Sequence, residues 1–166
     1  MLWIWSHLVR SVTTRSKDCV AMHSISVTAH PYVFGLNQLP PSGDVLYITG
    51  GEKDVLSLSS HGFHTICLNS ETAKVPEDLL PSLQERFNHI AILYDMDDTG
   101  RKESANRVNE LKELGCPSVL NIELPLCGSK QEKDISDFFR LGHTAQELSN
   151  LTEEAISIQN FRHRGR

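Results

Sequence analysis

The feature that most constrains the fold is the nearly continuous apolar run His89-Ile-Ala-Ile-Leu-Tyr94, which ends directly in the acidic segment Asp95-Met-Asp97-Asp98. A run of this kind is typical of a central parallel strand that is covered on both faces. Parallel strands need crossover connections, usually helices, and ligands of such sheets bind beyond the carboxyl ends of the strands. The sequence therefore predicts an α/β fold with the acidic segment at its ligand-binding edge.

Strand-like and helix-like segments alternate on both sides of this run. Besides residues 89–94, strands are predicted at 45–49, 63–68 and 118–124. Helices are predicted at 52–61, 77–87, 101–114 and 134–141, although proline at position 81 is unfavourable inside the second of them. The alternation indicates an α/β fold with a Rossmann-like, mostly parallel four-stranded sheet flanked by helices.

The segment Pro40-Pro41-Ser42-Gly43 precedes the first strongly periodic residues. We expect a domain at residues 33–145, a disordered or truncated leader at 1–32 and a helical or flexible tail at 146–166. The Ser- and Thr-rich start, with three basic residues against one acidic residue, weakly resembles a transit peptide, but the leader interpretation is favoured. No apolar run approaches the ~20 residues of a membrane span, so we expect a cytoplasmic protein without membrane contact.

The net charge and the spacing of the cysteines exclude several kinds of binding site. Sixteen Lys and Arg against 21 Asp and Glu give a formal charge of −5, which excludes a strongly basic nucleic-acid-binding coat. A phosphate-bearing partner must therefore be bound through a local patch or a metal ion. The four cysteines are far apart and form no C-x-x-C pair, so neither a structural zinc site nor a disulfide framework is expected.

Asp95 and Asp97 are the strongest candidates for chemistry. Carboxylates this close raise one another's pKa unless a cation lies between them, and hard oxygen ligands favour Mg²⁺. Asp98 is better explained as the N-cap of the helix that follows.

A second candidate segment, Thr49-Gly50-Gly51-Glu52-Lys53-Asp54, also joins a predicted strand to a helix. The glycines permit close backbone approach to a phosphate, and Glu52 or Asp54 could reach the same metal ion. The alternative is that these acidic residues only complement the helix dipole.

The third segment contains Lys133 and Asp134. Asp134 is a candidate N-cap of the last predicted helix, and Lys133 a candidate phosphate ligand. The cations most suited to phosphate are Lys53, Arg101, Lys102 and Lys133, each of which also fits an ordinary surface position.

Taken in order, the three segments resemble the Toprim domain of bacterial-type primases and primase-helicases, over residues 33–145. The segment 94–101 is similar to the family's D-x-D-x-x-G motif, and Lys133-Asp134 to its later K-D motif. Phe34-Gly35-Leu36 is similar to the lead-in of the primase-helicase branch. The resemblance implies Mg²⁺ or Mn²⁺ on Asp95 and Asp97, with nucleotidyl or phosphodiester transfer as the reaction. It also implies DNA or RNA and nucleotides as ligands, and primase or helicase modules as replication partners.

One position departs from the family motif, which usually reads E-G-x-x-D and whose leading glutamate is thought to serve in acid/base chemistry. Aligning Asp54 with the motif's aspartate puts Gly50 where that glutamate is expected. Glu52 is the candidate substitute as the catalytic residue. The alternative is a catalytically degenerate module that binds a metal or nucleic acid and acts through partners.

A second alternative is a phosphatase of the haloacid-dehalogenase type, because Asp95-Met-Asp97-Asp98-Thr99 also fits D-x-D-x-T. Asp95 would then be the nucleophile and Asp97 the acid/base. We rank this below Toprim, because only 67 residues follow Thr99. The upstream zinc module and polymerase subdomain of such primases are also missing, so we expect a stand-alone Toprim protein or a fragment of a larger one.

Overall fold

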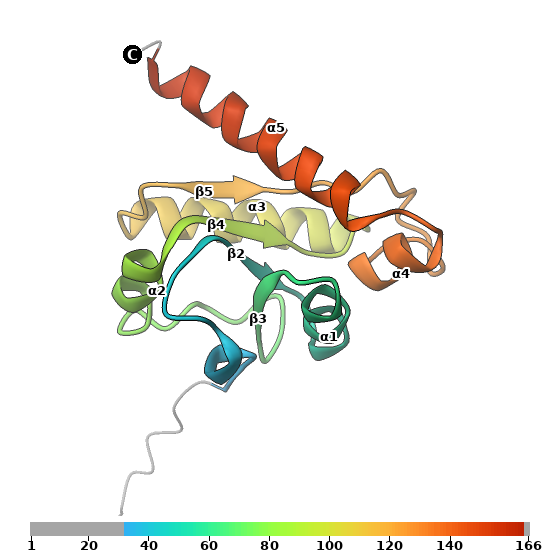
Figure 1. Cartoon of the computed structure of the whole chain (residues 1–166), viewed down its shortest axis with the longest axis horizontal. Coiled ribbons are helices and arrows are strands. Elements are labelled where there is room, and N and C mark those ends of the chain that lie inside the picture. Colours follow the sequence, from blue (N-terminus) through green and yellow to red (C-terminus); the bar gives the residue numbers. More distant parts are fainter. Residues whose placement is uncertain (1–31, 165–166) are drawn as a thin grey trace, which may run out of the picture.

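The computed structural model describes residues 32–164, which form an α/β fold around one five-stranded sheet (Figure 1). The strands are β1 (Val33–Phe34), β2 (Gly43–Thr49), β3 (His64–Leu68), β4 (Phe87–Leu93) and β5 (Val119–Asn121). The helices are η1 (Leu36–Gln38), α1 (Glu52–Ser60), α2 (Leu80–Arg86), α3 (Asp98–Glu113), α4 (Ile135–Arg140) and α5 (Ala145–Arg164). The predicted α/β class and mostly parallel sheet are confirmed.

The sheet has five strands rather than the four predicted. Its order is β1-β3-β2-β4-β5, and the additional strand β1 pairs antiparallel with β3 at one edge. β1 spans only two residues, so no alternation of apolar and polar side chains could reveal it.

The strands β3, β2 and β4 end at the same level, with β2 in the centre. It is parallel to both β3 and β4, and Thr49 at its end lies opposite Cys67 of β3 and Leu93 of β4. The segments that follow these three strands therefore leave the sheet side by side at one edge, where open α/β sheets bind ligands.

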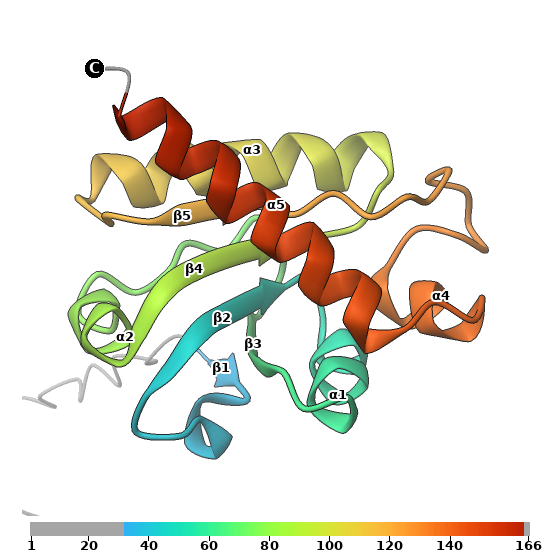
Figure 2. The same ribbon diagram turned by 45° about the horizontal axis from the view of Figure 1, so that its top comes forward.

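Two apolar layers cover the sheet, as the apolar run of β4 predicts. On one face the sheet packs against α2 and α3, with Leu83 and Leu111 fully buried. On the other face Tyr47 and Leu93 pack with Phe138 of α4 and with the first half of α5. Figure 2 shows α5 crossing this second face.

The segment 146–164 is helical and its first half belongs to the core. Leu148 is fully buried, and the hydroxyls of Tyr47 and Thr152 are hydrogen-bonded at 2.7 Å. The second half carries the exposed side chains of Ile158 and Phe161. The expected leader lies almost entirely outside the described residues. Among residues 32–164, no helix is both long and apolar enough to cross a membrane.

The boundaries of two elements differ from those predicted. α2 begins at Leu80 rather than near residue 77, because Pro81 fits only the first turn of a helix. β5 ends at Asn121, three residues earlier than predicted, and the chain beyond it forms the loop that returns to the end of β4.

Candidate functional site

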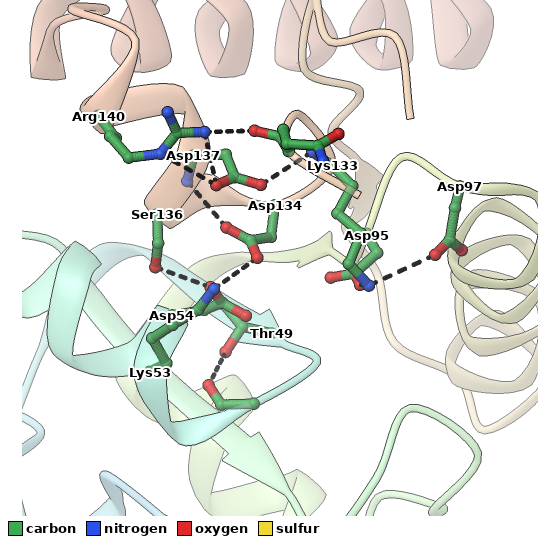
Figure 3. Close-up of polar contacts among 12 residues, drawn as sticks. Thr49, Lys53, Asp54, Asp95, Asp97, Lys133, Asp134, Ser136, Asp137 and Arg140 are labelled. Atoms are coloured by element: carbon green, nitrogen blue, oxygen red, sulfur yellow. Dashed lines mark hydrogen bonds and ion pairs between the residues drawn. The ribbon is translucent and has the colours of Figure 1, made fainter. Parts of the chain in front are cut away.

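The end of β4 places two carboxylates on either side of a buried methionine. Met96 is 4% exposed, and its backbone N–H donates to the carbonyl of Lys133 at 2.6 Å. Asp95 and Asp97 are half-buried, and their side chains reach the ammonium group of Lys133 (Figure 3). The loop after β5 thus brings a lysine to the acidic segment that was singled out in the sequence.

Asp97, not Asp98, is the N-cap of α3. Its Oδ1 accepts a hydrogen bond from the backbone N–H of Gly100 at 2.9 Å, and this bond is the main cause that lowers the pKa of Asp97. Asp98 is the first helical residue and is exposed, so the expectation for its role is corrected by one position. A Cβ at Gly100 would overlap the Asp95 carbonyl, which explains the glycine at this spacing.

Lys133 is held between the two carboxylates. Its Nζ forms an ion pair with Asp95 Oδ2 and lies 3.5 Å from Asp97 Oδ2. The hydrogen bond to Asp95 raises the pKa of Lys133, so the ammonium stays charged. The backbone N–H of Lys133 donates to Asp137 Oδ2 at 3.1 Å, and Gly128 in the same loop packs against the Met96 carbonyl. A positive charge therefore fits between Asp95 and Asp97.

The end of β2 and the start of α1 form a second polar cluster beside the first. Lys53 Nζ is 2.6 Å from Asp134 Oδ2, and Ser136 Oγ donates to Asp54 Oδ1 at 3.0 Å. Asp134 is the N-cap of α4, as expected, and accepts from the backbone N–H of Asp137 at 2.8 Å. Burial, and then the charge of Asp134, raises the pKa of Asp54 to about 6.

Glu71 is a neighbour of Asp95 that the sequence patterns did not single out. Its Oε1 accepts a hydrogen bond from the backbone N–H of Asp95 at 3.3 Å. Burial is the main cause that raises the pKa of Glu71, and the charges of Asp95 and Asp97 act in the same direction. Glu71 follows β3 by three residues, so the rule that selected Asp95, a carboxylate just beyond a strand, would also have selected it.

Two other predicted site residues, Glu52 and Arg101, make no ion pair or side-chain hydrogen bond with these carboxylates or lysines among the described residues. Glu52 is the first residue of α1 and is exposed. Burial of the Cys67 thiol, and then the charge of Glu52, raises the pKa of Cys67 to about 11. Arg101 Nη1 pairs with Glu123 Oε2 at 2.7 Å, and Arg101 Nε donates to the Met96 carbonyl at 2.9 Å. Gly51 is the N-cap of α1, with extended backbone.

The carboxylates of the site can be compared with the ligands that a divalent cation requires. Within the part of the chain that the structure describes, no three His, Cys, Asp or Glu side chains converge tightly enough to hold a metal ion. Mg²⁺ does not require three, because it keeps several waters and is usually bound by one or two carboxylates. Asp95 and Asp97, with Lys133 already marking a cation position between them, fit an ion of this type.

Comparisons with known proteins identify the family and structures of similar fold. A family model described as Toprim-like matches residues 47–139, more than half of the chain. No curated protein matches the sequence. The crystal structure of the primase fragment of the bacteriophage T7 primase-helicase protein is similar with a TM-score of 0.53 and 23% identity, covering 75% of this chain and 48% of that one.

A second similar structure contains the primase domains of two bacteriophage T7 gp4 subunits with the lagging-strand DNA polymerase, an RNA/DNA hybrid and dTTP. Its TM-score is 0.45 at 22% identity, with 70% of this chain and 55% of that chain covered. The chain thus spans about half the length of the structures it matches. At this level of identity the likeness shows the fold alone.

Proposed function

The chain belongs to the Toprim-like family. From that premise we propose that it is a Toprim domain of the primase type and performs Mg²⁺- or Mn²⁺-dependent nucleotidyl or phosphodiester transfer. The family places it in nucleic-acid metabolism. The observation that supports the proposal is the position of the Lys133 ammonium between Asp95 and Asp97, which puts a positive charge at the carboxyl edge of the sheet.

Asp95 and Asp97 would hold the divalent ion, which when bound polarises a phosphoryl oxygen and offsets its developing charge. Lys133 would then leave the two carboxylates and bind a phosphate oxygen nearby. Lys53, whose side chain is 65% exposed, is the second cation in reach of the same edge. Gly51, the N-cap of α1, leaves the backbone accessible to a phosphate group.

We propose DNA or RNA and nucleotides as the ligands. With a formal charge of −5, the chain lacks a general attraction for polyanions, so the contact has to be local and assisted by the metal ion. Because the chain spans about half of the proteins it resembles, we also propose that it works with primase or helicase modules, in the same polypeptide or in trans.

A titration calorimetry experiment with Mn²⁺ and Mg²⁺ tests the metal site. Asp95→Asn should abolish binding, because it removes the charge that pairs with Lys133. The matched control is Asp78→Asn, which removes an exposed carboxylate elsewhere and should leave the affinity unchanged. An unchanged affinity in Asp95→Asn would contradict the proposal.

A catalytically degenerate module remains the second candidate, favoured by the absence of a side chain at Gly50 at the end of β2. Primer-synthesis and nuclease assays on the same variants distinguish the two. Metal-dependent turnover that is lost in Asp95→Asn supports the enzyme, whereas metal binding without turnover supports the degenerate module. The match to the Toprim-like family favours both over the phosphatase alternative.

A further inference from the structure

We infer that Glu71 supplies, from the end of β3, the carboxylate that position 50 at the end of β2 lacks, and that it binds the water shell of the divalent cation beside Asp95 and Asp97. This inference rests on the proposed function, since it adds a residue to the same cation site. It replaces Glu52 as the additional carboxylate of the site.

The packing around Gly50 carries the argument. A Cβ at this position would lie 2.7 Å from Glu71 Oε1, 3.0 Å from Glu71 Cγ and 3.2 Å from Glu71 Cδ. The three nearest atoms thus all belong to one side chain. Gly50 is not among the glycines with positive φ, so its backbone does not require glycine. What the position requires is space, and the carboxyl arm of Glu71 fills that space.

The sheet topology places Glu71 next to the proposed cation ligands. The ends of β3, β2 and β4 are adjacent, so the segments carrying Glu71, Gly50 and Asp95 leave the sheet side by side. Glu71 Oε1 accepts from the Asp95 backbone N–H at 3.3 Å, which ties the glutamate to the first cation ligand. Bound Mg²⁺ keeps waters, and a carboxylate near such a site can accept hydrogen bonds from them.

A buried arginine fixes the backbone of Glu71. Arg107 is 3% exposed, and its Nη2 donates to the Glu71 carbonyl at 3.3 Å. Nη1 of the same guanidinium pairs with Glu110 in α3. The glutamate is therefore anchored through its own carbonyl, and its half-buried side chain extends over Gly50 from a fixed point.

The test measures Mn²⁺ affinity by calorimetry in Glu71→Gln and Glu52→Gln. Glutamine keeps the shape of Glu71 and an acceptor for the Asp95 N–H, so only the charge is lost. Loss of an outer partner of a metal site typically weakens metal affinity by ~10- to 100-fold, and we expect a loss in this range for Glu71→Gln. Glu52→Gln, the same chemical change on the neighbouring turn, should leave the affinity at the parental value.

Moving the carboxylate from position 71 to position 50 should restore the Mn²⁺ affinity. Gly50→Glu alone should lower the melting temperature, because its side chain collides with Glu71. Gly50→Glu combined with Glu71→Gly relieves the collision and returns a carboxylate to the same space, so the double variant should regain the Mn²⁺ affinity that Glu71→Gly loses. If the double variant does not fold, the comparison of the two glutamine variants decides alone.

The outcomes separate the two proposals. An affinity that is unchanged in Glu71→Gln, or lowered equally in Glu52→Gln, overturns the role of Glu71 while loss of binding in Asp95→Asn still upholds the proposed function. An affinity that is unchanged in Asp95→Asn overturns the proposed function itself.

Discussion

Replacing Asp54 with asparagine tests how the site is charged in the absence of metal. Asp54 is 7% exposed, and its pKa is raised from 3.8 to about 6 by burial and by the charge of Asp134. A carboxyl group whose pKa is higher in the folded state favours folding when protonated. Its contribution is therefore fully present below pH 3.8 and is lost as the pH rises through about 6.

The size of the pKa shift determines how much Asp54→Asn changes the free energy of unfolding. A difference of about two pKa units corresponds to ~3 kcal/mol of destabilisation once Asp54 is fully ionised. With these two pKa values, ~1 kcal/mol of that cost is already present at pH 4.5 and nearly all of it at pH 7.5. The stabilisation gained by Asp54→Asn should therefore grow by ~2 kcal/mol between the two pH values. The asparagine Oδ1 still accepts the hydrogen bond from Ser136.

Urea denaturation at pH 4.5 and pH 7.5, with EDTA present, measures this difference. The EDTA is needed because a bound cation would itself relieve the charge on Asp54. Asp78→Asn removes an exposed carboxylate and corrects for the change in net charge. A gain for Asp54→Asn that is equal at both pH values, or larger at pH 4.5, would refute the reasoning.

Three further substitutions test the packing and the cation position. Gly128→Ala should lower the melting temperature more than Gly115→Ala. Both glycines have positive φ, but of the two only Gly128 packs against the backbone after β4. Equal losses of melting temperature would contradict this contact. Lys133→Met should tighten Mn²⁺ binding in calorimetry, because the ammonium that competes with the metal ion for Asp95 is gone. Weaker binding would show that the lysine assists metal binding instead. Tyr47→Phe removes a buried hydrogen bond to Thr152 and should cost ~1 kcal/mol in urea denaturation, with no loss if the bond is not formed in solution.

The sequence was sufficient where the signal is local. The apolar run that becomes β4, the helix pattern of α3 and the carboxylates at the end of β4 are each visible within one short segment of the sequence. Because parallel strands end at the same edge, this local pattern also indicated where a site should form.

Other features depend on angles and distances that the sequence does not carry. The N-cap falls on Asp97 instead of Asp98 because α3 begins one residue earlier than a cap at Asp98 would require. Successive residues of a helix point about 100° apart, so the direction of Glu52 could not be read from its place after Gly51. The ion pair between Lys133 and Asp95 joins residues 38 positions apart, and only the folded loop after β5 brings them together.

Part of the site comes from a stretch of chain that is synthesised after the whole sheet. All five strands lie before residue 122, whereas Lys133, Asp134 and Ser136 come from the loop and helix that follow. Asp95 and Asp97 are therefore synthesised, with the whole sheet, before the lysine that pairs with them. Their carboxylates gain this counter-charge only once the loop after β5 has been added to the chain.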